Sequence, residues 1–202
     1  MKKIGIFGGS FNPVHWGHIK PVLAAQEAFG LQHVIYVPAA RPVHKAQDPL
    51  EDPYHRFAML ALAVGSLAGF SLSTFELHRP QTYTLDTLTH FRQQTTDGEI
   101  FFLLGSDSLQ QLPAWHEPRE ILKTAKLIVL SRPDFDVQEQ VAQLPEDLRS
   151  GLGSSILTFV HPKVRISGSQ IRQDLKQGKV PRSALPTAVL RYIQRHQLYR
   201  EA

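Results

Sequence analysis

The sequence contains no cysteine, and this absence removes several kinds of chemistry at once. Disulfides, thiolate zinc sites and cysteine nucleophiles are all excluded. No apolar run is long enough to cross a bilayer. The apolar run that follows Lys2 and Lys3 is also too short for a signal peptide. These features together predict a cytoplasmic protein with no membrane partner.

A dense block of lysine and arginine is also missing, although the chain has a formal net charge of +4. The basic residues are spread along the 202 positions and are not interleaved with aromatic residues. A nucleic-acid-binding surface typically gathers such residues in one patch, so we expect no nucleic-acid partner. A mildly basic enzyme that binds several phosphate groups would have the same composition.

Two common nucleotide-binding signatures are missing as well. The sequence has no G-x-x-x-x-G-K-[ST] motif, which excludes a P-loop kinase. Its first apolar segment is not followed by G-x-G-x-x-G, which disfavours a standard dinucleotide-binding dehydrogenase. A nucleotide site in this chain must therefore be built from other residues.

The sequence does contain a glycine- and histidine-rich turn near its beginning. Residues 4–7 form a short apolar run typical of a buried strand, and the stretch 8–18 (GGSFNPVHWGH) follows directly. Its glycines allow a polyphosphate to approach backbone N–H groups closely. His15 and His18 are three residues apart, so their imidazoles share one face of the helix that begins here. Such a pair beside a helix N-terminus suits negative charge that grows during a reaction.

Strand-like and helical segments alternate along the rest of the chain. The residue pattern predicts further strands at 33–37, 70–75, 99–104, 126–131 and 156–160. It predicts helices at 54–64, after 84, after 166 and from 186, and one weak helical stretch, 137–144, within a polar excursion over 134–155. This alternation favours an α/β fold, a doubly wound and mostly parallel sheet of the Rossmann-like type. Residues 1–202 are expected to form a single domain.

Two further turns carry polar residues at places where ligands bind. Gly105-Ser106-Asp107 follows the most apolar strand, and Asp107 either caps the next helix or meets a ligand at the carboxyl end of that strand. Ser167 opens a later helix, whose N–H groups could bind phosphate with help from Arg172 one turn on. In the simpler interpretation, a serine caps this helix and Arg172 is solvated.

Candidates for contacts with a second substrate lie between these turns. Lys45 belongs to a basic loop after the second strand. Tyr83 and Thr84 begin a helix, for which Thr84 is a reasonable N-cap. Trp115 follows a proline-containing loop, where its ring either joins the core or offers a face to a flat ligand.

The two terminal motifs resemble the signatures of the nucleotidyltransferase superfamily. The stretch 8–18 is similar to G-x-F-x-P-x-H-x-G-H, and residues 166–172 (ISGSQIR) are similar to I-S-S-T-x-I-R. Between them, several segments are similar, in the same order, to bacterial nicotinate-nucleotide adenylyltransferases: 42–45, 83–84, 105–107, 113–115 and 132–133. The pattern from Tyr192 to Tyr199 is also similar, so the resemblance covers nearly the whole chain.

This resemblance implies transfer of AMP from ATP to nicotinate mononucleotide, giving deamido-NAD and pyrophosphate in NAD biosynthesis. The catalytic residues it implies are His15, His18 and Arg172. The ATP site would contain these three together with Gly8, Gly9, Ser10, Phe11, Gly105, Asp107, Ile166 and Ser167. The acceptor site would contain Lys45, Tyr83, Thr84, Trp115 and Arg132. Mg²⁺ would be held mostly by ATP phosphates and water, without a carboxylate cage.

Three positions depart from the family pattern. Asn12 stands where the family often has aspartate. Residues 168–169 are Gly-Ser in place of a Ser-Thr pair, which removes one hydroxyl from the phosphate site. Residues 39–40 are alanines where relatives often carry asparagine. None of these three departures falls on His15, His18 or Arg172.

The sequence leaves other functions open. Within the superfamily the acceptor could instead be nicotinamide mononucleotide, phosphopantetheine, or a sugar or polyol phosphate. A non-catalytic nucleotide-binding module is disfavoured, because a sensor would not need both imidazoles. A zinc site at His15 and His18 lacks a third ligand at a recognisable spacing. The oligomeric state is not indicated by the sequence.

Overall fold

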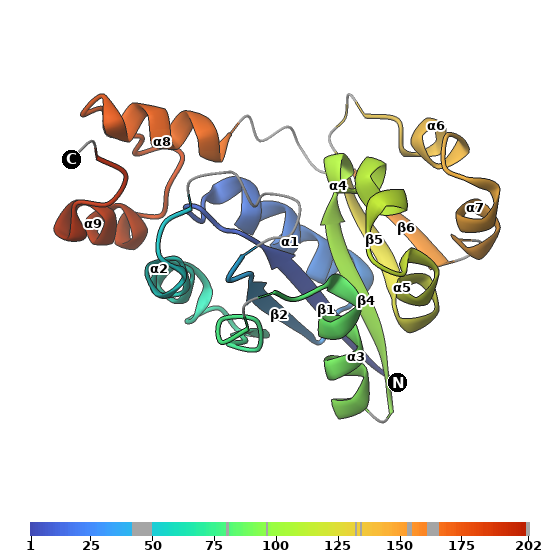
Figure 1. The fold of residues 1–202 in the computed structure, drawn as a ribbon. Helices are drawn as coiled ribbons and strands as arrows, with labels where there is room; N and C mark the ends of the chain where they lie inside the picture. Colours follow the sequence, from blue (N-terminus) through green and yellow to red (C-terminus); the bar gives the residue numbers. More distant parts are fainter. Residues whose placement is uncertain are drawn as a thin grey trace.

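The computed structural model describes residues 1–41, 50–79, 81–95, 97–131, 133, 135–152, 155–160 and 166–200. Within these ranges, one sheet of parallel strands runs in the order β3-β2-β1-β4-β5-β6 (Figure 1). The strands are β1 (Lys2–Gly9), β2 (His33–Pro38), β3 (Phe70–Leu72), β4 (Gly98–Gly105), β5 (Lys126–Ser131) and β6 (Ile156–Val160). This order defines a doubly wound Rossmann-type sheet, which confirms the fold class that the sequence predicts.

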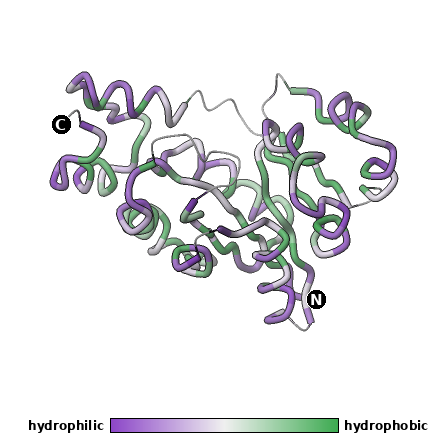
Figure 2. The backbone as a smooth tube through the Cα atoms, in the orientation of Figure 1, coloured by the Kyte–Doolittle hydropathy of each residue, from purple (hydrophilic) through white to green (hydrophobic). Residues whose placement is uncertain are grey.

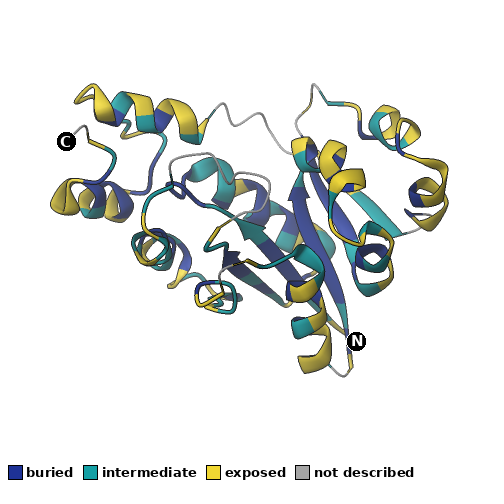
Figure 3. Cartoon of the chain, in the orientation of Figure 1, coloured by how far each residue is buried: buried dark blue, intermediate teal, exposed yellow. Residues whose placement is uncertain are grey.

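Helices cover both faces of the sheet, because alternate side chains of each strand point to opposite sides. Phe7 and Leu103 belong to one apolar cluster with α1 (Trp16–Phe29), α2 (Pro53–Val64), α8 (Gly168–Lys176) and α9 (Thr187–His196), in which α9 packs against α2. Ile6 and Phe102 face α3 (Thr84–Gln94), α4 (Ser106–Gln111), α5 (Pro118–Thr124), α6 (Val137–Ala142) and α7 (Glu146–Leu152). Figure 2 shows the apolar strands at the centre, and Figure 3 shows them buried beneath helices that expose their outer sides.

Local signals in the sequence explain where the helices begin and end. Helix α1 ends at Phe29, and its C-cap residue Gly30 has a φ of 62°, a left-handed conformation that favours glycine. Helix α2 begins after Asp52, whose carboxylate accepts a 2.8 Å hydrogen bond from the Tyr54 N–H. With Thr84 as its N-cap, α3 would begin at residue 85, but the helix begins at Thr84 itself. Its N-cap is Tyr83, not Thr84, because the Asp86 carboxylate accepts a hydrogen bond from the Tyr83 N–H.

Two segments differ from the sequence-based expectation. Strand β3 ends at Leu72 instead of continuing to residue 75, because the Ser73 hydroxyl accepts a hydrogen bond from the Phe75 N–H and turns the chain. The polar excursion contains two helices, α6 and α7, where one weak helical stretch was expected. These helices bury a few widely spaced apolar residues, Val137, Leu148 and Leu152, which is too sparse a pattern to predict them reliably.

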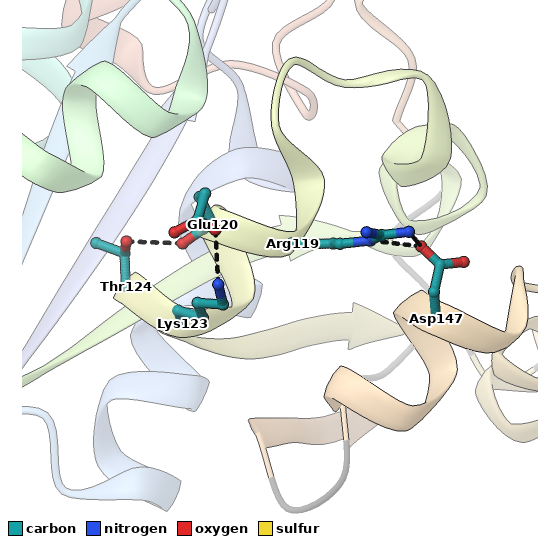
Figure 4. Close-up of polar contacts among 5 residues, drawn as sticks. All are labelled: Arg119, Glu120, Lys123, Thr124 and Asp147. Atoms are coloured by element: carbon teal, nitrogen blue, oxygen red, sulfur yellow. Dashed lines mark hydrogen bonds and ion pairs between the residues drawn. The ribbon is translucent and has the colours of Figure 1, made fainter.

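The excursion also contacts the rest of the protein through a surface ion pair. Arg119 of α5 donates to Asp147 of α7, with Nη2 and Oδ2 separated by 2.6 Å (Figure 4). The hydrogen bond from this guanidinium lowers the pKa of the Asp147 carboxyl. Both side chains are exposed, so the pair contributes little to stability. In the described ranges, no helix has the length and apolar character needed to cross a membrane.

Candidate active site

The candidate site lies where the strand order of the sheet reverses direction. Strand β1 pairs with β2 on one side and with β4 on the other, with Phe7 next to Leu103 in the register. The turn at 8–18 leaves the carboxyl end of β1, and the turn at 105–107 leaves the carboxyl end of β4. Open α/β sheets bind ligands at such a switch point. The fold therefore brings together two of the turns that the sequence indicates.

The two histidines of the first turn form a stacked pair. His15 is the N-cap residue of α1, and His18 lies in the first turn of this helix. Their ring centroids are 3.7 Å apart and their planes differ by 19°. A β-carbon on Gly17 would lie 2.9 Å from the His15 ring, so only glycine permits this packing. The shared face that their spacing predicts is thus present in the structure.

The Phe11 side chain packs against the His18 ring of this pair. Its ring is 1% exposed and meets the His18 imidazole edge-on, with 5.3 Å between the centroids. It also contacts Phe7 and Tyr36 in the core. The Phe11 side chain is therefore a core residue that positions His18, and only its backbone is available to line the nucleotide path proposed from the sequence.

Burial keeps the His15 imidazole uncharged. His15 is 6% exposed, and this desolvation lowers its pKa to about 4. Its Nδ1 atom is buried and has no hydrogen-bond partner within the part of the chain that the structure describes. An anionic ligand such as phosphate would raise the pKa of this imidazole and so favour its protonated form.

The helix start of the second motif approaches the first motif directly. A β-carbon built on Gly168 would lie 3.5 Å from Arg172 Nη1 and 3.7 Å from His15 Nε2. Arg172 Nη1 donates a 2.8 Å hydrogen bond to the Asn12 carbonyl. Ser167 is the exposed N-cap residue of α8, and Ile166 lies close to Gly17. The motifs from the two ends of the chain therefore form one site (Figure 1).

The turn after β4 presents a carboxylate. Gly105 is the N-cap residue of α4, and Asp107 is exposed in the first turn of this helix. Asp107 is therefore not the N-cap that the simpler interpretation expects. It lies just past the carboxyl end of β4, at the edge of the sheet where open α/β folds bind ligands.

The candidates for acceptor binding that the structure describes lie together on the other face of the sheet. The Tyr83 ring lies 4.3 Å from the ring of His116, which sequence reasoning missed. The neighbouring Trp115 is half-buried and meets Phe102 edge-on at 6.0 Å. The only sequence signal for His116 is that it directly follows Trp115. Lys45 and Arg132 lie outside the described residues.

Arg56 is a second residue that the sequence does not indicate. Its side chain is fully buried, and it donates hydrogen bonds of 2.7–2.9 Å to four backbone carbonyls. These carbonyls belong to Ser10, Ala39, Ala40 and Glu51. Arg56 thus joins the first turn to the loop after β2. A single arginine within an amphipathic helix gives no sequence signal for such a role.

The buried His15 imidazole should make the protein sensitive to acid. In the unfolded chain this group takes up a proton near pH 6.5, but in the folded chain only near pH 4. Its contribution to the free energy of unfolding is complete above pH 6.5 and is lost as the pH falls to about 4. The shift corresponds to a loss on the order of 3 kcal/mol. We expect urea unfolding to show this loss relative to a His15→Asn variant.

Glu76 has the opposite effect and provides the control. Burial raises its pKa to about 7, so its contribution is complete below pH 4.5 and is lost as the pH rises to 7. A Glu76→Gln variant keeps an oxygen for the Thr87 hydroxyl, which lies 2.6 Å from Glu76 Oε1. This variant should show the full acid slope of His15. Parallel pH dependence of wild type and His15→Asn between pH 4 and 7 would contradict the assignment.

The described site has few ligands for a resident metal ion. Among the residues in the described ranges, no group of three or more histidine, aspartate or glutamate side chains could hold a metal. The groups that converge are two imidazoles, one guanidinium and a helix N-terminus. Such donors bind anions. A parallel α/β sheet with this anion site at its switch point defines a nucleotide-binding protein of the Rossmann-like class.

Comparison with known proteins identifies the family within this class. The cytidylyltransferase-like family model matches residues 6–174. A Thermomicrobium roseum protein named "Probable nicotinate-nucleotide adenylyltransferase" is 38% identical, with 99% of this chain and 92% of that protein covered. A Thermus thermophilus protein of the same name is also 38% identical, with 98% and 100% covered. The chain belongs to the cytidylyltransferase-like family and, within it, to the nicotinate-nucleotide adenylyltransferases.

A solved structure supports the fold independently. Plasmodium falciparum nicotinic acid mononucleotide adenylyltransferase, solved in complex with NaAD, superposes with a TM-score of 0.79 at 21% identity. The alignment covers 98% of both chains. At this identity the likeness extends to the fold, which is the Rossmann-like sheet described above.

Proposed function

We propose that this protein transfers AMP from ATP to nicotinate mononucleotide, giving deamido-NAD and pyrophosphate for NAD biosynthesis. The observation that carries this proposal is the meeting of the stacked His15–His18 pair with the start of α8 and Arg172. This arrangement supplies donors for phosphate at the switch point of the sheet. Family membership supports the reaction, and the geometry of the site supports the residues proposed for it.

The reaction needs charge stabilisation more than a protein nucleophile. A phosphate oxygen of the mononucleotide attacks the α-phosphorus of ATP. The bond from the α-phosphorus to the bridging oxygen breaks, and pyrophosphate leaves with the electron pair. His15 and His18 stabilise the negative charge on the transferring and leaving phosphates, and Arg172 with the Ser167 helix start holds the β- and γ-phosphates. No covalent intermediate on the enzyme is required.

The remaining proposed contacts with ATP lie around this centre. Gly8, Gly9, Ser10 and the Phe11 backbone line the path of the phosphates and adenosine. Gly105 and Asp107 contact the adenosine side, and Ile166 packs beside the first turn. Mg²⁺, when bound with ATP, neutralises charge on the phosphates. The anion-binding donors described here leave its coordination to phosphate oxygens and water, which magnesium prefers.

The acceptor site is proposed at the start of α3 and the loop beside it. The Tyr83 N–H already donates to Asp86, so the backbone donors for a carboxylate begin at Thr84, in the first turn of the helix. Trp115 stacks on the pyridine ring in this proposal. Lys45 and Arg132 bind the acceptor phosphate. Residues 1–202 act as one adenylyltransferase domain in the cytoplasm, with no nucleic-acid or membrane partner.

Pyrophosphate release with ATP and Mg²⁺ tests this function. We expect at least a tenfold higher kcat/KM with nicotinate mononucleotide than with nicotinamide mononucleotide, because the two differ by a charged carboxylate that the α3 N–H groups would bind. Equal use of both would retain adenylyl transfer and remove the acceptor assignment. Release with neither would favour another phosphate acceptor or a non-catalytic nucleotide-binding module.

A further inference from the structure

Asn12 is a meeting point for distant parts of the chain. It is 5% exposed, and its side-chain oxygen accepts hydrogen bonds from the Glu51 N–H at 3.2 Å and the Tyr199 hydroxyl at 2.8 Å. Its carbonyl accepts the 2.8 Å bond from Arg172. The three partners lie 39, 187 and 160 positions away along the sequence. Asn12, a buried residue of the turn at 8–18, thus accepts three hydrogen bonds from distant parts of the chain.

The backbone near the C-terminal end directs Tyr199 toward this residue. Helix α9 ends at His196, its C-cap residue Gln197 has a φ of 54°, and Tyr199 has a φ of 61°. These left-handed conformations are uncommon outside glycine and cost free energy. Leu198, between them, is 7% exposed and fixes the segment to the core. The Gln197 conformation closes α9 as its C-cap, with its N–H bonded to the Ile193 and Gln194 carbonyls, so only the conformation of Tyr199 bears on the tyrosine.

The Tyr199 hydroxyl is suited to act as a permanent donor. Desolvation by burial raises the pKa of Tyr199, so the phenol keeps its proton at neutral pH. The Asn12 side-chain oxygen therefore accepts hydrogen bonds from both this hydroxyl and the Glu51 N–H. Removing a partner from a buried acceptor costs more than the hydrogen bond alone contributes.

The Glu51 segment connects this network to the loop after β2. The Glu51 N–H donates to Asn12, and the Glu51 carbonyl accepts from Arg56 Nε at 2.9 Å. Arg56 also holds the Ser10 carbonyl of the nucleotide-binding turn at 2.7 Å. The turn is therefore fixed at Ser10 by Arg56 and at Asn12 by Tyr199 and Arg172.

We propose that Tyr199 is a positioning residue for ATP binding, which orients Asn12 and, through the Asn12 carbonyl, the guanidinium of Arg172. The inference rests on the proposed function only in that ATP binds at this turn, and it does not depend on the acceptor. Tyr199 touches no reacting atom. It acts by holding the turn in the geometry that Arg172 and the stacked histidines require.

A Tyr199→Phe variant tests this role, because it removes one hydroxyl and leaves the packed ring in place. We expect the Kd for ATP with Mg²⁺, measured by calorimetry without an acceptor, to rise about five- to tenfold. Tyr192→Phe is the matched control. Its hydroxyl lies 2.9 Å from His55 Nδ1 of α2, so its removal should change the Kd by less than about twofold.

A double-mutant cycle separates positioning from a general structural effect. In an Asn12→Ala background the Tyr199→Phe change should raise the Kd by less than about twofold, because its partner is already gone. An unchanged Kd in the single variant, even with a lower Tm, would overturn the proposal. So would an equal rise in both backgrounds. A wild type that binds ATP but adenylates neither pyridine mononucleotide would refute the proposed acceptor and leave the Tyr199 result standing.

Discussion

A His18→Ala variant is expected to lose about 10²- to 10³-fold in kcat, because removing one positioned donor from a charge-stabilising site has an effect of this size. The loss should appear in turnover more than in substrate binding, since the charge on the phosphates grows during the transfer. His18 is half-buried and stacks on His15, so its truncation should leave the fold intact. Steady-state kinetics with ATP and nicotinate mononucleotide measures the effect.

The control for this variant is another stacked histidine. His90 of α3 stacks on Phe75, with 4.0 Å between ring centroids, and has no role in the proposed site. A His90→Ala variant should keep its kcat within about twofold of wild type. If His18→Ala melts normally and turns over near the wild-type rate, its assignment to the reaction is wrong.

An Arg56→Met variant is expected to lower the free energy of unfolding by about 3–5 kcal/mol, because several buried hydrogen bonds from a charged donor, each contributing about 1.5–3 kcal/mol, are lost together. Four backbone carbonyls would lose their donor inside the protein. Burial lowers the pKa of Arg56, but arginine begins so high that the guanidinium stays charged. Urea unfolding monitored by circular dichroism gives the change.

Two further variants define what Arg56 contributes. Arg56→Lys offers three donors in place of the planar fork that reaches all four carbonyls, so it should recover only part of the stability. Arg195→Met changes an exposed arginine of α9 and should cost less than about 0.5 kcal/mol. An Arg56→Met protein within about 1 kcal/mol of wild type would show that the carbonyls find other partners.

The sequence predicts the sheet well because its strands are short and apolar, and the central ones are buried. The pattern places β4 within one residue at each end of its observed bounds, and it gives β5 and β6 as observed. It overextends β3, because alternation continues past the turn that Ser73 forms. The pattern predicts only one weak helical stretch where α6 and α7 lie, because these helices bury too few residues to produce a clear helical periodicity.

The sequence predicts those parts of the candidate site in which the contacting residues belong to the same motif. His15 and His18 lie in one turn, so their spacing is sufficient to place their rings together. Arg56, Asn12 and His116 work through partners that are distant in the sequence. No local pattern specifies such contacts. The core position of Phe11 also depends on Tyr36, which only the folded sheet brings near.

The meeting of distant partners at Asn12 has a consequence for synthesis on the ribosome. Residues 1–18 emerge first, but the hydroxyl that holds Asn12 belongs to residue 199. A nascent chain can therefore form β1 and pair it with β4 long before its nucleotide-binding turn has all of its supports. Because the Tyr199 hydroxyl is one of these supports, the turn can reach its complete hydrogen-bonded form only after residue 199 has been made.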